Sequence, residues 1–365
     1  MQRIRVLSFP SFAKKDMVRG GERLTSSLAF DAVMVALATW FIGGVYLDGW
    51  AHIHIPKMET FFTPWHGALY SGYLVSALFL FAVLVKNMMN GYPLARALPA
   101  GYELSMLGAI VFAFGGVGDL IWHTIFGIEA SVDALLSPTH LLLATGASLI
   151  ATGPLRAAWQ RSPGRTTEKA GLPALLPAVV SLALFYSVLT FFTEYASPFG
   201  ETLAGMNRVP TGSSLTFRFQ ALGVAGFLLQ AAILMGVLLF IVRRWRLPFG
   251  SLTLLLTLNT LAMALMHSGR FSTGTYVMIG VGVLAGLSGD VLNWRLMPSA
   301  DRPAAFHWFG FLMPAVLYTL YYLALFIFGG GVWWSVHMWV GSIFMSGVVG
   351  LLLSYVVLPP PAPEL

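Results

Sequence analysis

The sequence predicts an all-α, polytopic integral membrane helical bundle of about ten transmembrane helices. Hydrophobic residues make up 57% of the 365-residue chain and charged residues only 10%, against about 25% charged residues in a soluble domain. Apolar runs recur along the whole length at roughly the 20 residues that a helix needs to cross a bilayer. Transmembrane β-strands would instead alternate in polarity over about ten residues.

The individual spans follow from these apolar runs and the polar segments between them. We expect them near residues 28–50, 64–85, 104–124, 138–157, 172–193, 215–242, 250–268, 273–293, 305–328 and 333–357. With the N-terminus placed inside and the spans alternating, 17 of the 21 Lys and Arg residues fall on the inner side. This positive-inside bias predicts that both termini are cytoplasmic.

Four segments are expected along the chain. Residues 1–27 form a basic cytoplasmic segment, and residues 28–157 form a duplicated half made of two helical hairpins. Residues 158–357 supply the remaining six helices of the same membrane domain, and the proline-rich residues 358–365 form a disordered tail.

Composition also excludes several kinds of function. The net charge is +6, but the basic residues sit at the ends of apolar runs, where they set topology, so no nucleic-acid partner is expected. The chain has no cysteine, which excludes thiolate metal sites, iron–sulfur clusters and c-type haem attachment. A metal would have to be held by histidine, carboxylate, amide, methionine or backbone groups.

Histidines gather on one side of the predicted membrane domain. Of the eight histidines, only His307 falls on the inner side. The other seven lie at outer helix ends or in outer loops: His52, His54, His66, His123, His140, His267 and His337.

The spacing of four residues within this group is informative. Asp48 and His52 are four residues apart, and so are Asp119 and His123. Residues i and i+4 lie on one face of a helix, one turn apart, so each pair offers a carboxylate and an imidazole to a common point. His54 is offset from His52 by two residues and should point elsewhere, and His267 and His337 lack a paired acid at this spacing.

A further histidine opens the helix that returns from each outer loop. The two openings read Thr63-Pro64-Trp65-His66 and Ser137-Pro138-Thr139-His140. Thr or Ser is a good N-cap and proline suits the first helical position. The positive end of the helix dipole disfavours imidazolium, which keeps each histidine in the neutral form that binds metals.

An acid precedes each returning histidine by seven residues, Glu59 in the first loop and Asp133 in the second. The chain therefore contains an internal hairpin repeat, offset by 71 residues for the Asp–His pairs and by 74 for the later acid and histidine. The repeat predicts two adjacent metal-binding sets or one shared site, with Glu59 and Asp133 as catalytic bases. The six predicted metal ligands are Asp48, His52, His66, Asp119, His123 and His140.

The pattern Asp48-x3-His52-x13-His66 resembles the Asp-x3-His-x12-His metal motif in the C subunit of the copper membrane monooxygenases, the particulate methane and ammonia monooxygenase group. The last spacing is one residue longer here, and Asp119-x3-His123-x16-His140 is a looser version. The resemblance covers about twenty residues of each hairpin. It implies copper ligands at these positions and additional membrane subunits as partners.

These observations favour a metal-dependent membrane oxidoreductase that acts on a small apolar or lipid-borne substrate, with copper as the leading metal. Zinc and iron also accept imidazole and carboxylate. A membrane-embedded zinc hydrolase and a transporter or metal-handling protein stay open as alternatives. The expected location is the cell membrane, the inner membrane if the source is bacterial, with the metal site towards the extracytoplasmic face.

Overall fold

The fold of the chain is known from a computed structural model, which describes residues 23–55, 62–127, 132–161, 171–269 and 271–359. These residues form a bundle of long helices and no strand. Nine of the described helices are long and apolar enough to cross a membrane, and a tenth, of 17 residues, is shorter but also apolar. The predicted all-α polytopic bundle is confirmed.

The first hairpin consists of α1 (Leu28–His54) and α2 (Pro64–Met89). The second consists of α3 (Glu103–Phe126), the short α4 (Val132–Leu136) and α5 (Pro138–Ala151), which continues as α6 (Gly153–Arg161). The span predicted at 138–157 is observed as one long apolar segment, Pro138–Arg161, whose helix is interrupted at Thr152. Pro154 causes this interruption because its nitrogen has no hydrogen to donate to the preceding helical turn.

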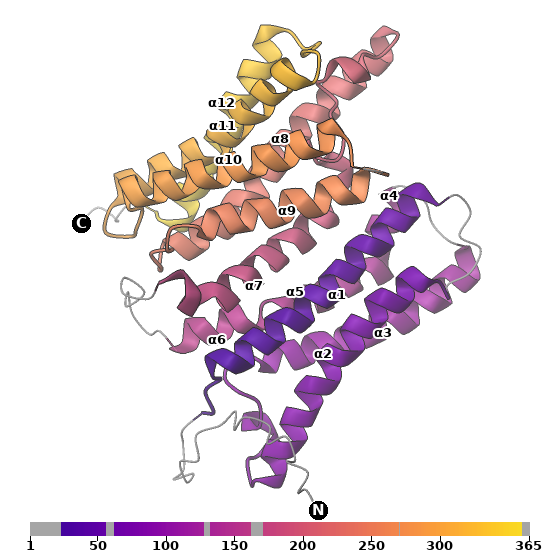
Figure 1. The fold of residues 1–365 in the computed structure, drawn as a ribbon, viewed down its shortest axis with the longest axis vertical. Coiled ribbons are helices and arrows are strands. Elements are labelled where there is room, and N and C mark those ends of the chain that lie inside the picture. The colour runs from indigo at the N-terminus through magenta and orange to yellow at the C-terminus, as the bar shows by residue number, and fades with distance from the viewer. Residues whose placement is uncertain (1–22, 56–61, 128–131, 162–170, 270, 360–365) are drawn as a thin grey trace, which may run out of the picture.

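Six more helices complete the bundle. They are α7 (Leu172–Phe191), α8 (Ser213–Val242), α9 (Ser251–His267), α10 (Thr273–Leu296), α11 (Pro303–Phe328) and α12 (Val336–Val357). Figure 1 shows α1 to α5 as one body and α8 with α10 to α12 as another, with α7 and α9 lying between them. Since α1 packs against both α7 and α9, the first hairpin lies against the rest of the bundle.

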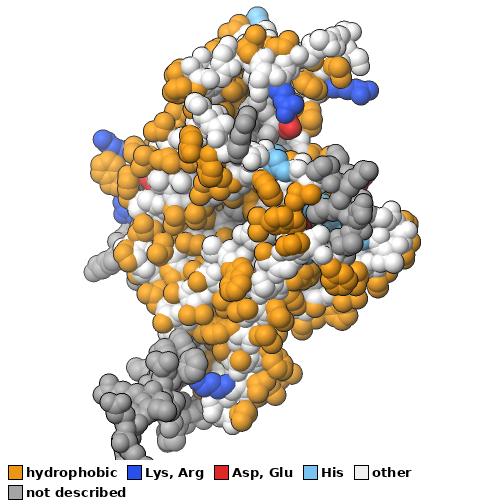
Figure 2. All heavy atoms as spheres, turned by 45° about the vertical axis from the view of Figure 1, so that its right-hand side comes forward, with side chains coloured by type: hydrophobic (Ala, Val, Ile, Leu, Met, Phe, Trp, Pro, Cys, Tyr) orange, Lys and Arg blue, Asp and Glu red, His pale blue; other side chains and the backbone are white. Residues whose placement is uncertain are grey.

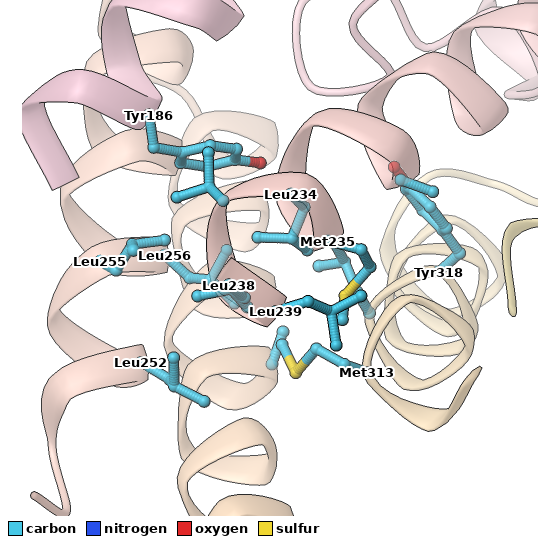
Figure 3. Packing of buried hydrophobic residues seen from close by; sticks show 14 of the residues in the cluster. Tyr186, Leu234, Met235, Leu238, Leu239, Leu252, Leu255, Leu256, Met313 and Tyr318 are labelled. Atoms are coloured by element: carbon cyan, nitrogen blue, oxygen red, sulfur yellow. The ribbon is translucent and has the colours of Figure 1, made fainter. Parts of the chain in front are cut away.

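Two kinds of apolar surface support this arrangement. Inside the bundle, α7, α8, α9 and α11 meet in a core of leucines, methionines and tyrosines, of which Leu234, Leu238 and Met313 are fully buried (Figure 3). Outside, hydrophobic side chains cover much of the face in Figure 2, and the charged side chains are few. Large exposed residues such as Phe114, at 70% exposure, are explained by contact with lipid.

Buried charges fix the ends of the first helices that lie away from the histidine clusters. Asp31 in α1 is fully buried, and its carboxylate lies 2.5 Å from Arg161 Nη2 at the end of α6. The Tyr102 hydroxyl, just before α3, donates to the same carboxylate at 2.7 Å. A buried charge is tolerated when it is paired in this way, so these contacts hold the two hairpins together below the histidine clusters.

Candidate metal centre

The first candidate ligand set lies at the C-terminal end of α1 and the start of α2. Because α1 remains helical through His54, Asp48 and His52 share a face, as their spacing predicted. Asp48 Oδ2 lies 3.7 Å from His52 Nε2 and 3.4 Å from His66 Nε2. One carboxylate oxygen thus faces an imidazole from each helix of the hairpin, and we call these three residues the first triad.

The second candidate set repeats this arrangement on α3 and α5. Asp119 Oδ2 lies 3.4 Å from His123 Nε2, and Asp119 Oδ1 lies 3.4 Å from His140 Nε2. We call Asp119, His123 and His140 the second triad. In each triad the three ligand atoms lie within 4.8 Å of one another, and the described residues contain no other group of three His, Cys, Asp or Glu side chains that meets this criterion.

The two returning histidines are positioned by their helix caps. The Thr63 side chain accepts a hydrogen bond from His66 N at 3.1 Å, and Ser137 Oγ accepts one from His140 N at 3.3 Å. Pro64 and Pro138 stand at the start of their helices. The predicted caps are confirmed, and they place each imidazole in the first turn, level with the carboxylate of the preceding helix.

The separations inside the triads fit metal ligands. Nitrogen and oxygen ligands at the zinc distances of about 2.0–2.1 Å, in a tetrahedral arrangement, stand roughly 3.3–3.4 Å apart. A hydrogen bond from nitrogen to oxygen would be shorter, typically about 2.7–3.2 Å. Three of the four Asp–His distances are 3.4 Å, so the triads have the dimensions of coordination sites.

A contact behind the second triad indicates which nitrogen of His123 carries the proton. His123 Nδ1 lies 3.2 Å from the Gly127 carbonyl oxygen, which can only accept a hydrogen bond. Nδ1 therefore carries a proton, and in a neutral ring the lone pair of Nε2 points at Asp119. Such hydrogen bonds are the usual means by which metal-binding histidines are oriented. Two lone pairs facing each other favour a cation between them.

The carboxylates of the two triads differ in their support. Thr139 Oγ1 donates to Asp119 Oδ1 at 3.0 Å. The residue at the matching place in the first hairpin is Trp65, which has no hydroxyl. Within the described residues, Asp48 Oδ1 is buried and has no hydrogen-bond partner. Asp119 is also more enclosed, with 2% of its side chain exposed against 13% for Asp48.

Both triads open into one cavity of about 400 Å³. Five of the six predicted ligands line it, and His123 is the exception. The remaining wall is largely apolar and includes Phe112, Leu143, Ala147 and Phe191. Ala147 lies seven residues below His140 on α5, which corresponds to a depth of roughly 10 Å. The cavity therefore extends from the triads towards the middle of the bundle and is large enough for a small ligand.

The two predicted catalytic bases are not brought to this cavity by the described structure. Glu59 lies outside the described residues. Asp133 is exposed on α4, and its neighbours Ala134 and Leu135 line the cavity instead. A catalytic role for these acids stays a prediction.

The structure pairs one further histidine with an acid that sequence spacing did not reveal. His267 Nε2 at the end of α9 lies 3.5 Å from Glu194 Oε2, which follows α7. The sequence shows no paired acid at helical spacing for His267, and the acid that the structure places beside it comes from the segment after α7. Their separation of 73 positions hides the pair in the sequence; their common place at predicted outer helix ends is the only sequence signal.

Two other histidines have structural contacts. His54 Nδ1 lies 2.9 Å from the Trp50 carbonyl oxygen, and the imidazole stacks on the Trp50 ring. On the opposite side of the bundle, His307 Nδ1 lies 2.8 Å from Ser354 Oγ. Packing and hydrogen-bond contacts therefore explain the positions of both side chains. The position of His54 agrees with the expectation that it points away from Asp48.

Comparison of the chain with protein-family models, with curated proteins and with solved structures gave no match. The resemblance to the copper membrane monooxygenases therefore rests on the two Asp–His–His patterns alone.

Proposed function

We propose that this protein binds two transition-metal ions, one in each triad, and that copper is the physiological metal of an extracytoplasmic oxidation site. The supporting observation is that two triads with ligand-like separations open into one apolar cavity. Two imidazoles and a carboxylate suit copper, zinc and iron. The missing thiolates and the motif resemblance favour copper among them.

The protein residues would bind the metal ions and hold a substrate close to them. Bound copper supplies one-electron redox chemistry, which the side chains themselves do not provide. The walls formed by Phe112, Leu143 and Phe191 would accept a small apolar molecule or the end of a lipid chain. Oxidation of a C–H bond would consume dioxygen and two electrons from a quinol-type reductant, placing one oxygen atom in the product and one in water.

A direct test is metal analysis of the purified full-length protein, with activity measured afterwards. We expect about two copper ions per chain and an electron paramagnetic resonance signal with nitrogen couplings from histidine. The His52→Ala/His123→Ala double variant should lose both ions while keeping its helical circular dichroism. Full metal occupancy in this double variant would refute the proposal.

A matched control removes two imidazoles that lie outside the triads. The His54→Ala/His337→Ala double variant changes histidine content by the same amount on the same predicted side, and it should keep both ions. Loss of copper from this variant would mean that the triads are not the binding sites.

A membrane-embedded zinc hydrolase is the second candidate, because each triad supplies three ligands and leaves a fourth position for water. It predicts zinc in the purified protein and hydrolysis of a lipid-borne ester or amide without oxygen consumption. Oxygen uptake that requires quinol, an apolar substrate and copper supports the proposed copper-dependent oxygenation instead. Metal uptake into sealed vesicles without either reaction would support a transporter.

The predicted side of the membrane can be tested separately. Reporter fusions after residue 205 and at residue 365 should show an extracytoplasmic and a cytoplasmic position, respectively, because the positive-inside bias places the C-terminus inside. An active periplasmic reporter at residue 365 would contradict the location proposed for the triads.

A further inference from the structure

A further acid–imidazole pair lies beside the cavity and has no part in the proposed function. Glu194 begins the short 3-10 helix Glu194–Ala196 directly after α7, and His267 is the last residue of α9. Their side chains are only 15% and 17% exposed, and Glu194 Oε2 lies 3.5 Å from His267 Nε2. The tertiary fold thus brings two metal-ligating groups together at the outer end of the bundle.

These two atoms have the same relationship as the ligand atoms of the triads. In the part of the chain that the structure describes, both are buried and neither has a hydrogen-bond partner. Leaving a buried polar atom without a hydrogen-bond partner is unfavourable, so two such atoms facing each other need an explanation. Their separation exceeds a usual hydrogen bond and is close to the ligand spacing of roughly 3.3–3.4 Å derived above from zinc bond lengths.

The place of the pair suggests what it does. Glu194 lines the cavity into which both triads open, whereas His267 lies behind it, at the end of α9. A turn of backbone lies against the imidazole: a Cβ added at Gly200 would come within 2.6 Å of His267 Nε2. Glycine at this position leaves free the space beside the nitrogen that would face an ion.

We propose that Glu194 and His267 form a third metal-binding site, which takes the same class of first-row transition-metal ion as the triads and loads it into the cavity. Two protein ligands, with water completing the coordination, bind an ion more weakly than three. A weaker site releases its ion faster, which suits transfer from the outer surface to the triads. This inference rests on the proposed metal-binding function but concerns different residues.

The test uses the full-length protein in nanodiscs, with Cu²⁺ and then Zn²⁺ as probes. Equilibrium titration of the wild-type protein should find two tight sites and one that is about 100-fold weaker. The weaker site has one protein ligand fewer, and a ligand worth about 2.8 kcal/mol changes the affinity 100-fold. Glu194→Gln and His267→Ala should each lose only the weaker site. Retention of three sites in both variants would overturn the proposal.

Loading is measured by mixing metal-free protein with limiting Cu²⁺. Filling of the triads should be about tenfold slower in Glu194→Gln and His267→Ala than in the wild type. An unchanged filling rate in these variants would overturn the loading role. His54→Ala is the matched control, and it should keep both the weak site and the wild-type rate.

Two further variants keep the result interpretable. Gly200→Ala retains both ligands but fills the space beside His267, so it should also abolish the weak site. If His267→Ala fails to fold, Gly200→Ala and Glu194→Gln still show whether Glu194 and His267 form the weak site. His52→Ala/His123→Ala should lose the tight sites and keep the weak one. A wild-type protein with only the weak site would refute the proposed function while supporting this inference.

Discussion

The two hairpins carry the same pattern of ligand residues, but the contacts that hold these ligands in place differ. In the second triad, Thr139 donates to Asp119, and His123 Nδ1 lies within hydrogen-bond distance of the Gly127 carbonyl. In the first triad, Asp48 Oδ1 has no hydrogen-bond partner among the described residues, and the His52 side chain is 24% exposed against 6% for His123. Repeated ligands therefore do not imply equal sites.

This difference has a consequence for metal binding. Residues that orient ligands typically contribute about 10–100-fold in metal affinity. The second triad should accordingly bind metal more tightly and exchange it more slowly. The first triad, with a less restrained carboxylate and more accessible imidazole, is better suited to a changing coordination during a reaction. The predictions below test this contrast, from the largest expected effect to the smallest.

Removing the central carboxylate should have the largest effect. Asp119→Ala should weaken metal binding at the second triad by more than about 100-fold, because a direct ligand contributes more than the residues that orient it. Asp48→Ala should do the same at the first triad. Competition titration with a chromophoric chelator measures both sites. Loss of both ions from either single variant would show that the triads form one inseparable centre.

Removing the support of Asp119 should have an intermediate effect. Thr139→Val keeps the shape of the side chain but loses the donor to Asp119 Oδ1, so affinity at the second triad should fall about 10–100-fold. Thr145→Val is the matched control, because the exposed Thr145 hydroxyl, within the described residues, donates to the Leu141 carbonyl of its own helix and to no ligand. An equal loss of metal affinity at both triads in Thr139→Val would contradict the prediction that Thr139 acts on the second triad alone.

Adding support to the first triad should have a smaller effect. Trp65→Thr places a hydroxyl where the second hairpin has Thr139, and we expect affinity at the first triad to rise by up to about tenfold. Trp65 packs edge-on against Trp50 at 5.7 Å between ring centroids, so protein stability should fall. Competition titration and thermal unfolding separate the two changes. A drop in affinity would show that the indole itself holds the site.

The helix caps should differ least between the hairpins. Loss of a Ser or Thr N-cap typically costs about 1 kcal/mol, so Thr63→Ala and Ser137→Ala should lower metal-free thermal stability by similar amounts. Ser137→Ala should additionally weaken metal binding, because Ser137 Oγ also lies 2.6 Å from His140 Nδ1. Unchanged metal affinity at the second triad in this variant would show that Ser137 acts only as a helix cap.

Several features followed from the sequence because they depend on neighbouring residues. Bilayer thickness fixes the length of an apolar run, so the spans could be read directly. Helical periodicity put Asp48 beside His52 and Asp119 beside His123, and local capping chemistry placed His66 and His140 in the first turns of their helices. Each inference needed only residues less than about one hairpin apart.

Tertiary structure decided what depends on packing between helices. The opening of both triads into one cavity required α1, α2, α3, α5 and α7 to meet around it. The pairing of Glu194 with His267 required α7 and α9 to end at the same level. The sequence predicted which groups could bind a metal within each hairpin. Side chains on separate helices show no periodicity relative to each other. Only helix packing therefore determined which groups of different hairpins and helices came together.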